Sequence, residues 1–204
     1  MYSETMIFDA PQEQIVYGIL GDTYVYINEK EIQVEEPVMS EGENSDGQTQ
    51  TVTKYSYDVR HFPLDDKTEK GVITALKKQI NDEISVFDSG QYAQFGDKAV
   101  NDFTINGIHM WLDKDTRNGL KFRFESQLAL NEKETTLWYN ITPIELNLNV
   151  AIGLVQALEV YASKCFDRTA AHRQAISELD NLVDIFNYDY TTGYPDHCHF
   201  GAEV

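Results

Sequence analysis

Polar and apolar residues alternate through much of the first third of the chain, with the period of a β-strand that buries one face. Three segments show the pattern: IVYGIL from Ile15, TYVYINEKEIQVEE from Thr23, and TVTKYSYDVRHF from Thr51. Gly21-Asp22 marks a turn between the first two segments. Residues 38–50 are acidic and rich in Gly and Ser, so we expect a long hairpin loop or mobile tip there. The pattern predicts an N-terminal antiparallel β unit of about three strands within residues 1–63.

After Pro63 the apolar period lengthens to that of a helix. Large apolar residues recur about one turn apart at Val72, Leu76, Ile80, Ile84 and Phe87. Residues 65–68 contain N-cap candidates. The spacing predicts a helix over residues 67–88, and we assign residues 64–95 to a connecting helix and linker.

From Asp102 onward, two hairpins each precede a helical pattern. In FTINGIHMW, Asn106-Gly107 supplies the two positive φ angles that a type I′ turn requires. Asp113 or Asp115 then caps a helix that carries Leu120, Phe124 and Leu128.

The second hairpin is TTLWY, which turns through residues 140–143 and returns as IELNL. Asn147 or Asn149 caps the longest helix, which either continues to Leu179 or breaks near residues 167–169. Residues 96–204 are therefore predicted to form a C-terminal ββαββα domain with a turn-rich tail, and the chain is predicted to be an α+β protein.

The two hairpin-and-helix segments are similar when the chain is shifted by 34 residues. The shift pairs Asn106 with Asn140, Leu112 with Leu146, Gly119 with Gly153, Leu120 with Leu154, and Glu125 with Glu159. Each hairpin needs a helix to cover its apolar face, so an internal pseudo-repeat is a physically motivated hypothesis.

The charge and composition exclude several classes of function. The formal net charge is -18, which repels phosphate backbones and anionic lipid headgroups, so no nucleic-acid or membrane partner is expected. We expect neither a signal peptide nor a membrane span, since the N-terminus is not basic and no run of 18 apolar residues occurs. The acidic surface serves either solubility or contact with a basic partner surface.

Metal-binding patterns are weak in this sequence. His197, Cys198 and His199 form the densest set of candidate ligands, but in an extended chain the cysteine points away from both histidines. We interpret them as part of a structural or disordered tail, with adventitious nickel or zinc binding as the alternative. Asp113 and Asp115 resemble the start of a calcium loop, but Asn118 and Phe124 stand where that loop needs Gly and Glu.

Catalytic motifs are also lacking. The sequence contains no G-x-S-x-G elbow, no phosphate-binding loop and no dinucleotide fingerprint, so we expect a protein that is not an enzyme and needs no cofactor. Trp111 and Trp138 are expected to fill the core. Together with Tyr139, Tyr188, Tyr190 and Tyr194 they could instead form a platform on which sugars stack.

Several motifs in the second half resemble an uncharacterised domain family of tailed-phage and prophage proteins of the Bacteroidota type. They are Trp111-Leu-Asp-Lys-Asp-Thr-Arg117, Thr135-Thr-Leu-Trp138, Ala157-Leu-Glu-Val-Tyr161 and Tyr188-Asp-Tyr-Thr-Thr-Gly-Tyr-Pro195. The resemblance covers about 95 of the 204 residues. That family often stands at the C-terminal end of tail-fibre or tail-fibre-assembly proteins.

The resemblance implies that the protein acts in a phage particle or its assembly, but it implies no reaction, because the family offers no catalytic residues that can be assigned to this chain. Its motif residues act as fold determinants: Asp113 or Asp115 caps a helix, Trp111 and Trp138 pack, and Gly193 to Pro195 turn the chain. We therefore expect a non-catalytic phage structural or assembly protein, made in the host bacterial cytoplasm and found in the virion. Its partners would be other phage structural proteins or a second copy of the chain, met through exposed β-edges of the N-terminal unit. The alternatives are a tail-fibre assembly chaperone absent from the mature virion and a glycan- or receptor-binding module.

Overall fold

The computed structural model describes residues 3–18, 21–37 and 49–201. The loop predicted at residues 38–50 lies, up to residue 48, outside the described residues. The chain is an α+β protein, as predicted, and its residues form two compact units. Unit 1 contains the residues up to Ile80 together with Leu179–Tyr188, and unit 2 contains Asn81–Glu178 and the residues from Asp189 onward.

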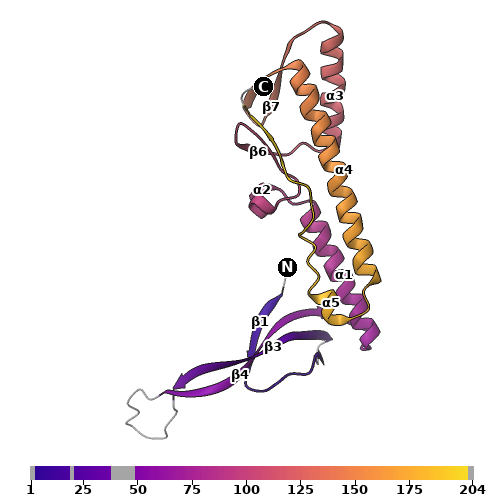
Figure 1. Ribbon diagram of the computed structural model, residues 1–204. Coiled ribbons are helices and arrows are strands. Elements are labelled where there is room, and N and C mark those ends of the chain that lie inside the picture. The colour runs from indigo at the N-terminus through magenta and orange to yellow at the C-terminus, as the bar shows by residue number, and fades with distance from the viewer. Residues whose placement is uncertain (1–2, 19–20, 38–48, 202–204) are drawn as a thin grey trace. The chain divides into compact units, whose positions relative to one another are not determined.

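Unit 1 is built on a four-stranded antiparallel sheet with the strand order β1-β4-β3-β2 (Figure 1). The strands are β1 (Glu4–Phe8), β2 (Ile15–Tyr17), β3 (Asp22–Pro37) and β4 (Thr49–Pro63). The three segments with alternating polarity form β2, β3 and β4, and Gly21 adopts the positive φ of 90° expected at the turn. β1 is a fourth strand that was not predicted, because ETMIF is short and does not alternate in polarity.

The sheet of unit 1 buries both of its faces near its base. On one face Tyr26, Tyr57 and Val59 are buried, and Phe8 meets the Tyr26 ring edge to face at 5.4 Å. Val25 and Ile27 alternate with Tyr26 and are buried on the other face.

Unit 1 also contains helical segments: the first helix as far as Ile80, the remainder of which belongs to unit 2, and a short helix within Leu179–Tyr188. α1 (Glu69–Asp88) confirms the predicted helix, and Thr68 caps it by accepting a hydrogen bond from the Gly71 N–H at 3.0 Å. Its predicted apolar stripe is buried, with Val72, Leu76 and Ile80 fully inaccessible. α5 (Leu182–Phe186) was not predicted, and its Phe186 ring lies under the guanidinium of the buried Arg60 at 5.2 Å.

Unit 2 has the predicted ββαββα order. Its elements are α2 (Tyr92–Phe95), a 3₁₀ turn (Gly96–Lys98), β5 (Phe103–Ile105), β6 (Ile108–Met110), α3 (Lys114–Ala129), β7 (Glu134–Tyr139), β8 (Thr142–Asn147), α4 (Leu148–Glu178) and β9 (Cys198–Phe200). β5 and β6 form the first hairpin, β7 and β8 form the second, and α3 packs against α4. One core cluster joins both hairpins to both helices through Phe103, Leu112, Phe124, Leu137, Leu146, Leu154 and Leu158.

The ends of the helices follow the predicted capping residues. Asp113, rather than Asp115, is the N-cap of α3, and its carboxylate accepts a hydrogen bond from the Thr116 N–H at 2.7 Å. At the start of α4 the Asn147 side chain accepts from the Asn149 N–H at 3.0 Å. α4 runs unbroken for 31 residues, so the helix does not break near residues 167–169.

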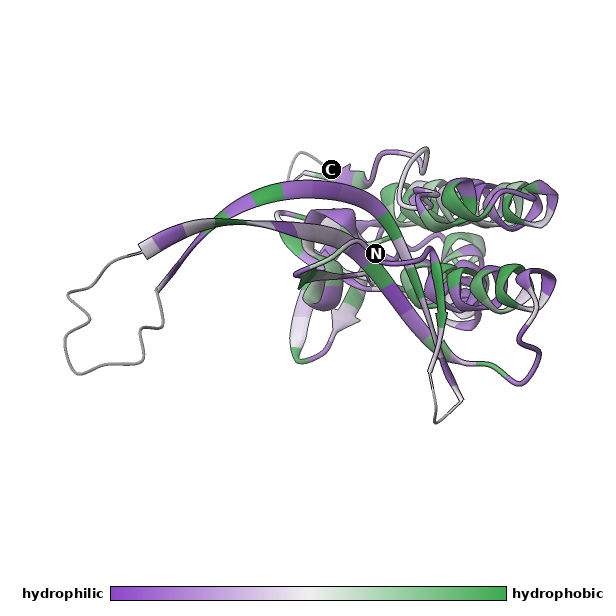
Figure 2. Ribbon diagram, turned by 90° about the horizontal axis from the view of Figure 1, so that it is seen from below, coloured by the Kyte–Doolittle hydropathy of each residue, from purple (hydrophilic) through white to green (hydrophobic). Residues whose placement is uncertain are grey.

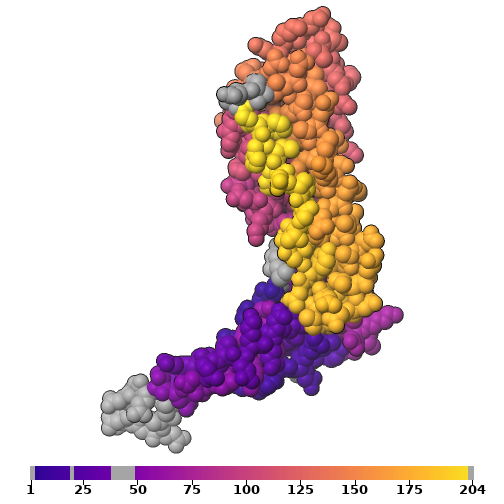
Figure 3. Space-filling view, in the orientation of Figure 1, coloured from indigo at the N-terminus to yellow at the C-terminus, as the bar shows by residue number. Residues whose placement is uncertain are grey.

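The C-terminal segment, defined here as residues 189–200, packs along unit 2. Figure 3 shows it at the surface of this unit, beside α4. Its last residues form β9, which pairs in parallel with β5 and makes a three-stranded sheet of order β6-β5-β9. The sequence did not indicate this strand, because three residues that pair with a strand 95 positions earlier carry no local pattern.

Candidate functional site

The longest strands of unit 1 extend beyond their neighbours as a two-stranded ribbon. β1 pairs with β4 only as far as Tyr55, and β2 pairs with β3 only as far as Val25. Beyond these limits, residues 32–37 of β3 pair with residues 49–54 of β4 and with no other described strand. We call these twelve residues the arm. Both outer edges of the arm therefore present backbone N–H and C=O groups that belong to no ladder.

The arm has little apolar surface to stabilise it. Ile32, Val34 and Val52 are half-buried, while Gln33, Glu35, Thr51 and Thr53 are exposed. Figure 2 shows a narrow ribbon in which short apolar stretches alternate with hydrophilic ones. A two-stranded hairpin is marginally stable by itself in water, so a ribbon of this kind is suited to binding rather than to supporting the core.

The two edges of the arm differ in chemistry. The β3 side carries Glu35, Glu36 and Pro37, which are residue types that block the addition of a further strand. On the β4 side residues 49–53 read TQTVT, which is uncharged, free of proline and rich in β-branched residues. The β4 edge is therefore the one open to pairing.

Lys54 lies at the end of the β4 edge, next to Tyr55, where β4 begins to pair with β1. Its ammonium group contacts Glu36 and also Asp9, the latter at 3.2 Å. Hydrogen bonds with Glu36 first, and with Asp9, raise the pKa of Lys54 above its usual value. These contacts hold the base of the arm to the residue that follows β1.

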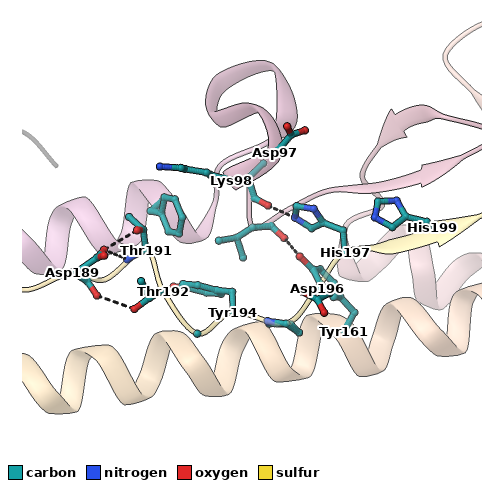
Figure 4. A pocket seen from close by; sticks show the side chains of 15 residues that line it. Asp97, Lys98, Tyr161, Asp189, Thr191, Thr192, Tyr194, Asp196, His197 and His199 are labelled. Atoms are coloured by element: carbon teal, nitrogen blue, oxygen red, sulfur yellow. Dashed lines mark hydrogen bonds between the residues drawn. The ribbon is translucent and has the colours of Figure 1, made fainter.

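The largest hollow described in unit 2 has a volume of about 670 Å³ and lies along the C-terminal segment (Figure 4). It is lined by Phe87, by residues 97–100, by Tyr161 and by residues of the C-terminal segment. The Tyr161 hydroxyl donates to the Val100 carbonyl at 2.7 Å, and the His197 ring contacts the Ala99 carbonyl at 2.6 Å.

The ionisable groups around this hollow serve its internal bonding. Hydrogen bonds from Thr191 hold the pKa of Asp189 below its usual value, while burial raises the pKa of Tyr161 and of Tyr194. Gly193 turns the segment with a φ of 77°. The carbonyl of the preceding residue, Thr192, accepts a hydrogen bond from the Arg168 guanidinium at 2.9 Å. The contacts of Arg168 with Thr192 and of His197 with Ala99 thus fasten the C-terminal segment to the body of the unit.

The candidate metal ligands point to different partners. His197 contacts Ala99, as described, and His199 lies 2.9 Å from the Thr104 hydroxyl. Cys198 lies opposite Phe103 in the parallel pair, and burial raises the pKa of its thiol. Within the described residues no group of three or more His, Cys, Asp or Glu side chains is arranged to hold a metal ion. That the chain binds no metal stays a prediction.

The second cysteine and the buried histidine are also poorly placed for chemistry. Burial raises the pKa of Cys165 to about 11 and lowers the pKa of His172. The thiolate is the reactive form of cysteine, so Cys165 is held in its unreactive form at neutral pH.

The predicted fold-determining residues behave as follows. Asn106 and Gly107 adopt φ angles of 52° and 76° at the tip of the first hairpin, and Asp115 lies in the exposed first turn of α3. Trp111 is half-buried against the core cluster, and Pro195 follows the Gly193 turn.

Trp138 corrects the expectation that both tryptophans fill the core, because 62% of its surface is exposed. Successive side chains in a strand point to opposite faces, and Leu137 occupies the core-facing position of β7. The sugar platform does not assemble as proposed either, since Tyr190 is buried and donates to Glu83 at 3.0 Å.

Two features of unit 2 were missed by the sequence patterns. The buried Arg117 donates to Glu159 at 2.9 Å and to the Leu112 carbonyl at 2.6 Å. His109 and the buried Asp102 lie 2.8 Å apart. Neither pair has a sequence signature, because the first depends on how α3 and α4 meet in space and the second depends on the register of the β5–β6 hairpin.

Comparisons with known proteins gave no match: no family model, no curated protein and no solved structure matches this chain. Among the described residues, no helix has both the length and the apolar character needed to cross a bilayer.

Proposed function

We propose that this chain is a non-catalytic structural or assembly protein of a tailed bacteriophage, and that it acts by protein–protein contact through its arm. The phage context rests on the motifs of the second half that resemble tail-fibre and tail-fibre-assembly proteins. The mode of action rests on the open β4 edge at residues 49–53.

The β4 edge supports strand addition as the binding mode. An extended segment of a partner can pair with an unprotected edge, and main-chain hydrogen bonds then supply the affinity. Proteins usually guard such edges with charges or proline, as the β3 side of the arm is guarded by Glu35, Glu36 and Pro37. An edge left unguarded beside a guarded one is consistent with selection for a partner.

The bonding inside unit 2 supports a role without catalysis. Tyr161 and Asp189 line its largest described hollow and are held in hydrogen bonds to neighbouring backbone or hydroxyl groups. Burial raises the pKa of the thiols of Cys165 and Cys198. Groups arranged in this way stabilise a scaffold.

Mass spectrometry of purified phage particles tests the proposal. Particles would be produced by infection or prophage induction of the bacterium that encodes the chain. We expect the chain at a fixed ratio to other particle proteins. If it is absent from particles but bound to a tail-fibre protein in infected cells, the chaperone alternative holds, and if it is absent from both, the proposal is wrong.

A matched pair of variants tests the arm. Gln33 and Thr53 are cross-strand partners, both exposed, and they share one hydrogen bond of 3.1 Å. Thr53→Lys and Gln33→Lys therefore make the same change of charge and lose the same bond, but on opposite edges. We expect Thr53→Lys to reduce incorporation into particles or binding to the client, and Gln33→Lys to leave it unchanged. Equal effects of the two variants would contradict a role for the β4 edge.

A further inference from the structure

A second hollow in unit 2, of about 140 Å³, combines aromatic rings with a buried carboxylate. Its lining includes Tyr92, Asn101, Asp102, His109, Trp111 and Tyr139. These residues come from α2, from the segment before β5, from β6 and the residue that follows it, and from β7. The volume is sufficient for one side-chain head group.

Asp102 is the unusual group of this hollow, since only 1% of its surface is exposed. Its Oδ2 atom lies 2.8 Å from Nδ1 of His109. Its Oδ1 atom is buried and has no hydrogen-bond partner among the described residues. A buried carboxylate oxygen that accepts no hydrogen bond destabilises the folded protein. A ligand that supplies a hydrogen-bond donor would remove this cost.

The rings define what kind of donor fits. The Tyr92 ring stacks on His109 with 3.4 Å between centroids, and Trp111 and Tyr139 are half-buried in the lining. Aromatic faces attract cations through their quadrupole, most strongly in tryptophan and tyrosine. A guanidinium or ammonium group would meet both features, because it donates hydrogen bonds and carries positive charge.

We propose that this hollow binds one basic side chain, an arginine or a lysine, of a partner protein. The head group packs against the rings of Trp111 and Tyr139 and, once a lining side chain moves aside to uncover the buried Oδ1 of Asp102, donates to that oxygen. The net charge of -18 favours the approach of a basic partner surface. A sugar hydroxyl could also donate to Oδ1, but it carries no positive charge, so it lacks the ion pair with the carboxylate and the attraction of a cation to the rings. The site does not involve the arm and is tested separately from it.

The experiment compares two blocked amino acids of nearly the same shape. The chain has two tryptophans, so Trp138→Phe leaves Trp111 as the sole tryptophan reporter. Blocked arginine is titrated against this protein while Trp111 fluorescence is recorded, and blocked citrulline, which is uncharged, serves as the control. We expect blocked arginine to bind about ten-fold more tightly or better, from the added strength of a charged hydrogen bond.

Variants of the same protein locate the binding. Asp102→Asn should weaken blocked arginine about ten-fold or more. The matched control is Glu134→Gln, which makes the same charge change at an exposed position of β7 and should leave binding unchanged. If Asp102→Asn does not fold, Tyr139→Leu provides the test, since it removes one ring of the lining.

Three outcomes would overturn the proposal. They are equal binding of blocked arginine and blocked citrulline, blocked arginine binding that survives both Asp102→Asn and Tyr139→Leu, and saturable binding of glucose or galactose without binding of blocked arginine.

Discussion

At the scale of single residues, Arg117 connects several elements of unit 2. Its side chain is 6% exposed, whereas that of its partner Glu159 is 51% exposed. The guanidinium also donates to the carbonyl of Leu112, which follows the first hairpin, and lies 5.4 Å from the centre of the Trp111 ring. One cation therefore fastens a hairpin, α3 and α4 together.

Replacing Arg117 with leucine should lower the free energy of unfolding by about 2–3 kcal/mol, because it leaves the Leu112 carbonyl without its donor and removes a charged hydrogen bond. Urea unfolding at pH 7 measures the loss. Lys121→Leu is the control, since it removes the same charge from an exposed position of α3 and should change stability by about 0.5 kcal/mol or less. A loss no larger than that of the control would show that Arg117 is not a structural anchor.

Asp113 gives a residue-scale prediction about pH. Hydrogen bonds from Thr116, with its backbone N–H first, hold the pKa of Asp113 below its usual value. A carboxyl whose pKa is depressed in the folded state contributes stability above the unfolded pKa of about 4, and this is lost as the pH falls through the folded pKa. The stability difference between wild type and Asp113→Ala should therefore be larger at pH 7 than at pH 3 in urea unfolding. A constant difference would mean that the charge of the cap contributes nothing.

Residues whose role is set by the local chain could be predicted, and residues whose role is set by packing could not. Asp113, Asn106 and Gly193 do what their neighbours in sequence indicate, because capping and positive φ are local properties. Trp138 was assigned to the core as a large aromatic residue on a hairpin strand that leads into a helix, and the strand alternation placed Leu137 there instead. The pairing of Asp102 with His109 depends on the register of one hairpin.

At the scale of elements, the two hairpin-and-helix segments follow the 34-residue shift closely. Asn106 and Asn140 both have a φ of 52°, and α3 and α4 begin at Lys114 and Leu148, which are 34 residues apart. These agreements support an internal pseudo-repeat, whose full superposition stays a prediction. The segments differ beyond their helix starts, since α4 is 31 residues long and α3 is 16.

The shared turn geometry predicts a shared response to substitution. At a φ of 52° a β-branched residue is strained, so Asn140→Val should cost about 1–2 kcal/mol of stability, and Asn106→Val should cost a similar amount. Asn140→Gly should be neutral within about 0.5 kcal/mol, because glycine adopts this conformation freely. Thermal unfolding of the variants measures these differences. Equal stability of the Val and Gly variants at either turn would show that the positive φ is not required there.

Element existence was predictable where a period persisted for many residues. The stripe of α1 and the alternation in β3 and β4 each extend over at least twelve residues, and each predicted its element. β1, β9 and α5 have five residues or fewer, and each is stabilised by contacts with distant parts of its own unit. The same limit explains why open β-edges could be expected in the N-terminal unit but not assigned to residues 49–53.

At the scale of the whole molecule, we expect that most of the arm can be removed without preventing the rest of the chain from folding. Replacing residues 34–52 with Asn-Gly joins the paired residues Gln33 and Thr53 by a two-residue turn. The described part of this segment contains no fully buried side chain, so the free energy of unfolding should change by about 1 kcal/mol or less. Deleting β1 provides the contrast, because it removes Phe8 and Met6 from the aromatic cluster and should destabilise clearly.

The change in net charge gives a second prediction for the same truncation. The segment 34–52 holds five acidic residues and no basic one, so its removal changes the net charge from -18 to -13. Repulsion among the acidic residues falls when the net charge falls, and salt screens the repulsion that remains. The Debye length is about 30 Å at 10 mM salt and about 8 Å at 150 mM salt. Any stability gained by the truncation should therefore be larger at 10 mM salt. Urea unfolding of both proteins at the two salt concentrations measures this. A truncated chain that folds normally in both conditions yet no longer joins particles or its client would assign the arm to binding, whereas one that unfolds would assign it to the core.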